Sequence, residues 1–376
     1  MTSIIQEILH IRKGDYPVID RNNRNRYRIV AIEPDGSRTA YYFATPIYHQ
    51  ATRKMIDLKF HEDGEKIYAT GSNASLTFSD SIRMENADGS CQVAPFGHIS
   101  RISEHELSFG GNGRVTLTTN GFACFLPCGG KESIPFELEV SEPYPDIRAN
   151  DRCFALMKES FRPFLSVCCI GTVGASGHII APAKLICQKL TDRRFTLSFV
   201  PCSPMGKGVL LEANLYEAKL FQDTTVESGH AGVNNAFGSI GFIGHTTEYG
   251  EQWLYSRPDH SRMPELGDKR ILRAVWHIPR WNCTTADMTA YRLLTRFCSF
   301  GSTWEHKIPA TSAVSNSATE YSFVRMDLTD ILSDRHGRFV PSEGILLKAS
   351  GTQNAFSVIS TGDCYLRPQI LEVSYR

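Results

Sequence analysis

The sequence predicts an all-β protein of two antiparallel β-sandwich or jelly-roll-like domains, with a third small domain left open. Short runs rich in Val, Ile, Tyr, Phe and Thr alternate with tight-turn dipeptides, while segments of helical periodicity are scarce. Asp35-Gly36, Asp63-Gly64 and Asn120-Gly121 each separate two such runs. Asp-Gly and Asn-Gly accept the positive φ angles of hairpin turns, so they typically join twisted antiparallel strands.

The predicted strands follow one another along the chain. Hairpins are expected over residues 27–48, 55–71 and 114–126. Further strands are expected over residues 135–140, 163–173, 183–190, 194–203 and 208–220. Two segments have apolar residues at helical spacing, residues 2–11 and 153–160, and each is short.

The chain length favours more than one domain. A single hydrophobic core rarely grows past about 250–300 residues, and this chain has 376. We expect an N-terminal β-sandwich region over residues 1–214 and a second sandwich over residues 215–376. Residues 144–152 are the expected linker and sub-boundary within the first region.

Composition excludes several classes of protein. The 40 basic and 40 acidic residues give a formal net charge of zero, which does not suit a non-specific nucleic-acid binder or a polybasic membrane anchor. No apolar run reaches the roughly 18–20 residues that a membrane-spanning helix needs. The 11 cysteines are odd in number and lie mostly in apolar runs, so reduced structural thiols and a reducing compartment are expected. Cys124 and Cys128 lack the second pair that a zinc site needs.

The order of sequence blocks in residues 215–376 carries a further signal. A run with Asp223-Thr224 precedes a loop of Asn and Gly and a short run ending in Gly244. Thr303-Trp304 then precedes Pro309, and the chain ends in GILLK and PQILEVSY runs. This order resembles the DNRLRE domain, a bacterial β-sandwich module of cell-surface, wall-associated and carbohydrate-active proteins. DKRILR, residues 268–273, holds the place of the family's signature hexapeptide.

The resemblance implies a jelly-roll-like sandwich that acts in adhesion, wall association or glycan binding. It places the protein at the cell surface or outside the cell. The N-terminus predicts the opposite, because Gln6, Glu7 and His10 interrupt the one run that could serve as a secretion signal. The cysteines also favour the cell interior, so localisation stays open.

The candidate glycan contacts are aromatic and polar residues of the second domain. Sugars bind on exposed aromatic planes with a few polar groups beside them. Residues 248–260 form a loop-like stretch that offers such a set, and one further tryptophan lies downstream. The candidates are Trp253, Tyr255, Arg257, Asp259 and Trp281. Structural packing is the alternative for each, and Trp276 is expected in the core.

A calcium ion is the other occupant considered, since no other cofactor is expected. Asp223 and Asp363 lie near the two ends of the second domain, where β-sandwich glycan modules often hold calcium through 6–8 oxygen ligands. Alternatively, Asp223 keeps an edge strand soluble and Asp363 is a turn residue. Four arginines at positions 21, 24, 26 and 28 either bind an anion or form a solvated arm.

The sequence contains no nucleophile elbow, phosphate loop, zinc-protease helix or dinucleotide fingerprint. We therefore expect a non-catalytic binding or scaffold protein that recognises a glycan or a protein partner through loops of the second sandwich. Two alternatives stay open. One is a polysaccharide lyase or glycosidase, for which the carboxylates of residues 248–265 are candidates. The other is a structural subunit of a phage-like or multi-protein assembly.

Overall fold

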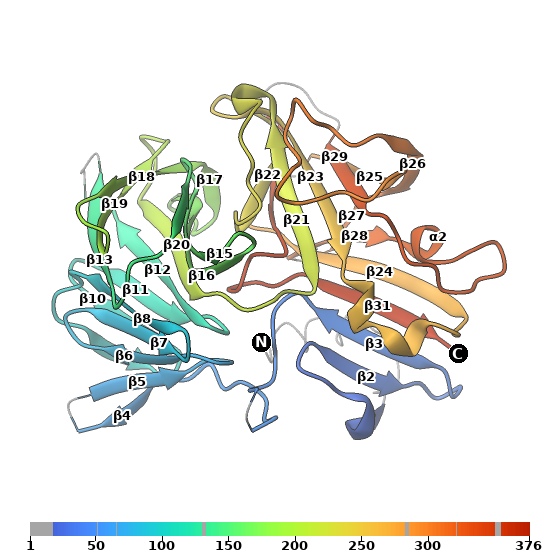
Figure 1. Cartoon of the computed structure of the whole chain (residues 1–376), viewed down its shortest axis with the longest axis horizontal. Helices are drawn as coiled ribbons and strands as arrows, with labels where there is room; N and C mark the ends of the chain where they lie inside the picture. Colours follow the sequence, from blue (N-terminus) through green and yellow to red (C-terminus); the bar gives the residue numbers. More distant parts are fainter. Residues whose placement is uncertain are drawn as a thin grey trace.

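The computed structural model describes residues 18–50, 52–64, 66–129, 133–282, 286–320, 322–349 and 355–376. Four antiparallel sheets form two sandwiches that lie side by side (Figure 1). The all-β prediction is confirmed. The described helical elements are short: η1 (Arg21–Asn23), η2 (Ser228–His230), η3 (His260–Arg262), η4 (Pro264–Leu266) and α2 (Thr329–Leu332). None of the helices in these residues is long and apolar enough to cross a membrane.

The first sandwich consists of an eight-stranded and a nine-stranded sheet. The eight-stranded sheet contains β4 (His61–Asp63), β5 (Lys66–Thr70), β6 (Ser75–Phe78), β7 (Ile82–Asn86), β8 (Gly89–Ala94), β13 (Ile134–Val140), β18 (Ala183–Lys189) and β19 (Arg194–Pro201). The nine-stranded sheet contains β9 (Ser100–Ser103), β10 (Glu106–Phe109), β11 (Gly113–Leu117), β12 (Gly121–Pro127), β14 (Asp146–Ala149), β15 (Cys153–Glu159), β16 (Arg162–Val173), β17 (Ile179–Ala181) and β20 (Gly208–Leu215). One apolar core fills the space between the sheets, with Phe122, Phe154, Phe195 and Leu211 among its members.

The second sandwich consists of two seven-stranded sheets. One contains β1 (Val18–Ile19), β2 (Arg28–Ile32), β3 (Arg38–Phe43), β24 (Ile271–Pro279), β27 (Ala318–Glu320), β28 (Phe323–Asp327) and β31 (Ile370–Tyr375). The other contains β21 (Phe221–Glu227), β22 (Ile240–Thr246), β23 (Gly250–Pro258), β25 (Met288–Leu293), β26 (Ala310–Asn316), β29 (Ile345–Ala349) and β30 (Phe356–Ser360). Their shared core contains Tyr42, Leu254, Trp276 and Leu371, so the predicted core position of Trp276 is confirmed.

The sheets divide the chain differently from the predicted regions 1–214 and 215–376. Strand β3 pairs with β31, with Ala40 opposite Val373 and Tyr42 opposite Leu371. The first hairpin therefore belongs to the second sandwich, and the first sandwich lies between two parts of it in the sequence (Figure 1). Asp35-Gly36 does join β2 to β3, with Gly36 at a φ of 79°. A turn dipeptide specifies its own hairpin but not the sheet that the hairpin joins.

Two local predictions in the first sandwich are wrong. Residues 153–160 were expected to be helical but form strand β15, and the expected linker at 144–152 contains edge strand β14. Strand β15 is buried on both faces. Phe154 and Leu156 point into the core of the first sandwich, whereas Cys153 and Met157 pack with Phe237 of the second. A strand buried on both faces has a continuous apolar run without period-two alternation, so its pattern resembles a short buried helix. The predicted helix at residues 2–11 lies outside the described residues.

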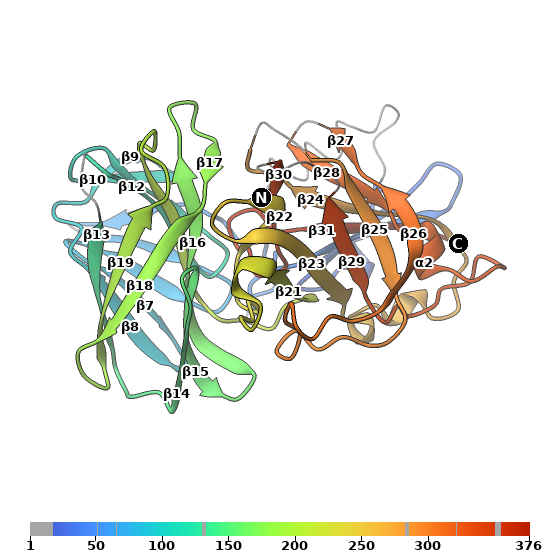
Figure 2. The same cartoon turned by 90° about the horizontal axis from the view of Figure 1, so that it is seen from above.

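The two sandwiches meet through this outer face of the nine-stranded sheet. An apolar cluster joins Ile170 and Ile179 of the first sandwich to Phe242 and Val358 of the second. Figure 2 shows the resulting side-by-side arrangement, with the segment around η2 at the junction. The junction is therefore an apolar interface, which limits relative motion of the two sandwiches.

Candidate functional site

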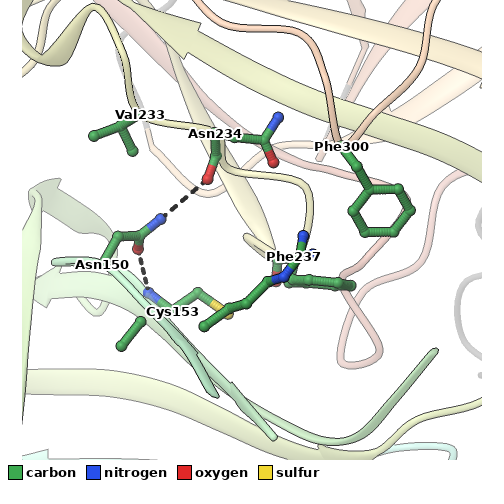
Figure 3. A pocket seen from close by; sticks show the side chains of 8 residues that line it. Asn150, Cys153, Val233, Asn234, Phe237 and Phe300 are labelled. Atoms are coloured by element: carbon green, nitrogen blue, oxygen red, sulfur yellow. Dashed lines mark hydrogen bonds between the residues drawn. The ribbon is translucent and has the colours of Figure 1, made fainter. Parts of the chain in front are cut away.

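Two adjacent pockets lie at the junction between the sandwiches. The first is a cavity of about 260 Å³ lined by Arg148, Ala149, Asn150, Cys153, Val233, Asn234, Phe237 and Phe300 (Figure 3). The second, of about 210 Å³, is lined by Phe161, Tyr216, Ala218, Lys219, Phe221, Gln222, Asp223, Ala236, Phe237, Asp259, Arg262, Ser299, Phe300 and Asp363. The pockets share Phe237 and Phe300 and receive residues from both sandwiches. We call the two together the junction groove.

Aromatic rings from both sandwiches line the junction groove. Phe161, in the turn between β15 and β16, is 62% exposed, and its ring centroid lies 4.9 Å from that of Phe300. The ring of Phe237 lies 5.2 Å from Phe300 on the other side. The guanidinium of Arg148 lies 5.6 Å from the Phe300 ring. The groove thus combines the exposed ring of Phe161 with the half-buried ring of Phe300 and the buried ring of Phe237.

A cluster of three buried charged side chains lies in the second pocket. Lys219 and Asp363 form an ion pair in which the side chains are 5% and 7% exposed. Asp223, on β21, accepts a hydrogen bond from the backbone N–H of Gly362 through Oδ2. Its other oxygen, Oδ1, is buried and accepts no hydrogen bond among the described residues. One of the two carboxylates is thus only half satisfied.

Burial displaces the pKa values of this cluster. It raises the pKa of Asp223 to about 7, although the Gly362 N–H and the Lys219 charge act in the opposite direction. It lowers the pKa of Lys219 to about 8, against the favourable charge of Asp223. Displaced pKa values in a pocket are typical of functional sites, because such sites bury charged groups that the fold alone does not require.

The rim of the second pocket carries a more exposed ion pair. Asp259 caps η3 by accepting from the N–H of Ser261, and it contacts Nε of Arg262 at 3.2 Å. The Arg262 guanidinium lies 4.8 Å from the ring of Tyr27. The rim therefore presents a balanced pair of charges, in contrast to the buried cluster beneath it.

Buried polar contacts hold the two walls of the groove together. Arg152, in the turn between β14 and β15, forms an ion pair with Glu227 at the end of β21, and both are almost fully buried. The Arg152 guanidinium also lies 4.0 Å from the Tyr249 ring. Asn150 donates to the side-chain oxygen of Asn235 at 2.9 Å. It also donates to the Asn234 carbonyl at 3.4 Å and holds the turn by accepting from the Cys153 N–H (Figure 3). These contacts fix the geometry of the first pocket.

The predicted glycan-binding loop is a strand. Residues 250–258 form β23, which pairs with β21, β22 and β29. Trp253 lies on the outer face of this sheet, where the Lys348 ammonium is 3.8 Å and the Trp304 ring 4.7 Å from its ring. Tyr255 is fully buried, and its hydroxyl donates to the Ile308 carbonyl at 3.4 Å. The neighbouring segment covers this face, so neither ring presents a free plane.

The other two predicted contacts lie apart from each other. Arg257, also on β23, donates to Gln222 at 2.7 Å. Trp281 donates through Nε1 to the Ser360 hydroxyl at 3.0 Å, and its ring lies 5.1 Å from the Arg367 guanidinium. The five predicted contacts therefore do not form one site. Asp259 alone among them lines the junction groove.

The two predicted calcium ligands do come together. Asp223 and Asp363 both line the second pocket, although they are 140 positions apart in the sequence. In this structure the ammonium group of Lys219 forms an ion pair with Asp363, at a place where calcium was predicted. No group of three or more His, Cys, Asp or Glu side chains arranged to hold a metal occurs in the described part of the chain. Calcium binding stays a prediction.

Sequence reasoning missed Lys219 and the three phenylalanines at positions 161, 237 and 300. No local pattern marks them, since each is a single residue in a turn or connection and their proximity depends on the docking of the two sandwiches. A third pocket, of about 410 Å³, lies beside the turn between β5 and β6. Its ionisable side chains, His49 and Glu85, are not buried. The junction groove is thus the stronger candidate.

Comparison with known proteins adds no assignment to this geometry. The chain matches no protein-family model, no curated protein and no solved structure. The resemblance to the DNRLRE domain therefore stays a prediction.

Proposed function

We propose that this is a non-catalytic binding protein that recognises a saccharide in the junction groove. The observation that carries the proposal is the combination in one groove of an exposed aromatic ring, Phe161, with a buried carboxylate, Asp223, whose Oδ1 has no hydrogen-bond donor among the described residues. Aromatic planes and a few convergent polar groups are the features by which proteins orient such ligands.

The groove supports a saccharide better than the outer face of β23 does. A sugar ring stacks on an aromatic plane, and its hydroxyls exchange hydrogen bonds with charged side chains. At Trp253 the plane is already in contact with lysines of the same chain. At Phe161 more than half of the side chain is open to solvent, so a sugar ring can reach the part of this ring that Phe300 does not cover.

A glycan array tests the proposal with purified full-length chain, in parallel buffers with calcium and with a chelator. The decisive variant is Phe161→Ala, whose matched control is Tyr68→Ala. Tyr68 lies on β5 in the first sandwich and is 39% exposed. We expect glycans bound by the native chain to lose about ten-fold in affinity in F161A, the equivalent of roughly 1.4 kcal/mol, and to bind Y68A unchanged.

The outcomes separate the alternatives. Binding that survives F161A but is lost in Trp253→Ala would move the site to the outer face of β23. Absence of binding to every glycan would overturn the saccharide class. Binding only in the calcium buffer, lost in Asp363→Asn, would support the predicted calcium site as part of the same groove.

A second candidate is a carbohydrate-active enzyme. It is favoured by one observation, the Asp223 carboxyl whose pKa is raised to about 7 in a groove that also contains Asp363. A carboxyl with such a pKa suits a general acid near neutral pH. Release of reducing sugar from a polysaccharide panel, abolished by Asp223→Asn, would replace the binding proposal with this one.

A further inference from the structure

We infer that the junction groove selects saccharides that carry a free primary amine, and that the ammonium group of the ligand lies against the Asp223 carboxylate. This inference rests on the proposed function and names the class of saccharide for the same site. It follows from the charge balance of the buried cluster, from an unused acceptor and from the surrounding rings.

The buried cluster lacks one positive charge whenever Asp223 is ionised, a form that is populated at neutral pH because the pKa of Asp223 is about 7. Lys219, Asp223 and Asp363 are each less than a tenth exposed, and they supply two carboxylates and one ammonium. Lys219 is in direct contact with Asp363. Among the described residues Asp223 has no ion-pair contact of its own, and the charge of Lys219 acts on it only from a greater distance. A ligand ammonium would bring the cluster to neutrality. Burying an unpaired charge is costly, so neutralisation is a strong source of affinity.

One oxygen of Asp223 also lacks a hydrogen-bond donor among the described residues. Its Oδ2 accepts from the Gly362 N–H, whereas its buried Oδ1 has no partner among the described residues. A carboxylate oxygen left without a donor in a buried position loses its solvation without compensation. An ammonium group is compact and carries three N–H donors. It can therefore satisfy Oδ1 and still donate to a second acceptor in the pocket.

The other groups that face the pocket favour a cation over an anion. The charge of Arg262 at the rim is balanced by Asp259. The walls include Phe221, Phe237 and Phe300, and the faces of aromatic rings attract cations. An acidic saccharide would place its carboxylate or sulfate near an unpaired carboxylate. A neutral saccharide could supply only a hydroxyl donor, without the charge.

The test compares chitosan oligosaccharides, which carry free amines, with N-acetylated chitin oligosaccharides of the same length. Isothermal titration calorimetry on the full-length chain at neutral pH should give at least ten-fold tighter binding for the amine form. Asp223→Asn should remove this preference. Asp192→Asn, which changes a carboxylate that is 78% exposed in the turn between β18 and β19, away from the groove, should retain it. Phe161→Ala should weaken both ligands together.

Three results would overturn the inference: equal or tighter binding of the N-acetylated form to the native chain, a preference that survives in D223N, or binding of array glycans without any binding of the amine form. The last result leaves the saccharide proposal intact, whereas a chain that binds no glycan at all removes both. Near-ultraviolet circular dichroism checks that D223N is folded. The preference of the native chain decides the inference even if that variant is not.

Discussion

Replacing Arg152 with methionine is expected to lower the free energy of unfolding by roughly 3–5 kcal/mol. Arg152 belongs to the first sandwich and reaches Glu227 of the second, and the two side chains are 3% and 0% exposed. Methionine preserves most of the volume of the arginine stem but removes its charge. The substitution therefore leaves the Glu227 carboxylate buried without its guanidinium.

The remaining contacts place the effect toward the lower part of that range. Without Arg152, Glu227 still accepts from Gln252 at 2.8 Å and contacts His230 at 2.9 Å. These two contacts offset part of the desolvation of the carboxylate. The loss of the guanidinium from the Tyr249 ring, 4.0 Å away, adds a smaller cation–π contribution of up to about 2 kcal/mol.

Urea unfolding followed by two probes measures the effect. All 4 tryptophans, at positions 253, 276, 281 and 304, belong to the second sandwich, so their fluorescence reports that sandwich, while far-ultraviolet circular dichroism reports both. We expect the two transitions to coincide in the native chain and to separate in R152M, because the variant weakens the junction.

Two further variants serve as controls. Arg194→Met removes an arginine that is 50% exposed and paired with an exposed Glu137, and it should change stability by no more than about 1 kcal/mol. The double variant R152M/E227M removes both buried charges and should recover much of the loss, since a buried ion pair replaced by apolar groups is often nearly neutral. The reasoning is refuted if R152M unfolds within about 1 kcal/mol of the native chain, or if the double variant is the less stable of the two.

Three further predictions follow from buried groups. The pKa of Asp223 rises from 3.8 to about 7, so the native state keeps a proton that the unfolded chain releases. This contribution to stability is complete below pH 3.8 and is lost as the pH rises through 7. Between these pH values the urea midpoint of D223N should therefore vary less than that of the native chain. The same pH profile in both proteins would contradict the raised pKa of Asp223. Trp276→Ala should lower the free energy of unfolding by about 3–5 kcal/mol because the side chain is fully buried. The control is Leu272→Ala on the same strand, where the side chain is 41% exposed and the loss should be less than about 1 kcal/mol. Similar losses in both variants would count against the core position of Trp276. Gly121→Ala should lower the free energy of unfolding by about 1–3 kcal/mol in thermal or urea unfolding, because a Cβ there would lie 2.0 Å from a backbone oxygen of β20. A variant as stable as the native chain would show that β12 and β20 can move apart.

The candidate site was only partly predictable. Asp223, Asp363 and Asp259 were singled out from the sequence, and all three line the junction groove. They were chosen for carboxylate chemistry, which a residue type reveals by itself. The partner assigned to Asp223 and Asp363 was a calcium ion, and Asp259 was assigned to a glycan. The structure places Lys219 against Asp363. No spacing rule could reveal that contact, because Lys219 lies in the segment that links β20 of the first sandwich to β21 of the second, whereas Asp363 lies between β30 and β31.

The exposure of the candidate aromatic rings was not predictable from the sequence for a related reason. Trp253 and Tyr255 are two positions apart and therefore lie on the same outer face of a strand. The alternation does not reveal whether another segment of the chain covers that face. The segment that carries Trp304 and Ile308 packs over β23 and contacts both residues. Whether an aromatic side chain is a free plane or a buried one depends on such distant segments.

The sequence by itself determined the all-β class and several hairpins, because turn dipeptides and side-chain alternation act over a few residues. Gly36 and Asn120-Gly121 specify their turns locally, and the strands on either side pair as expected. Only the tertiary structure decided that β3 pairs with β31, that β15 is buried on both faces and that a groove lies between the sandwiches. These features arise from pairing and docking between segments that are far apart in the sequence, which depend on the shape and burial of complete faces rather than on any local pattern.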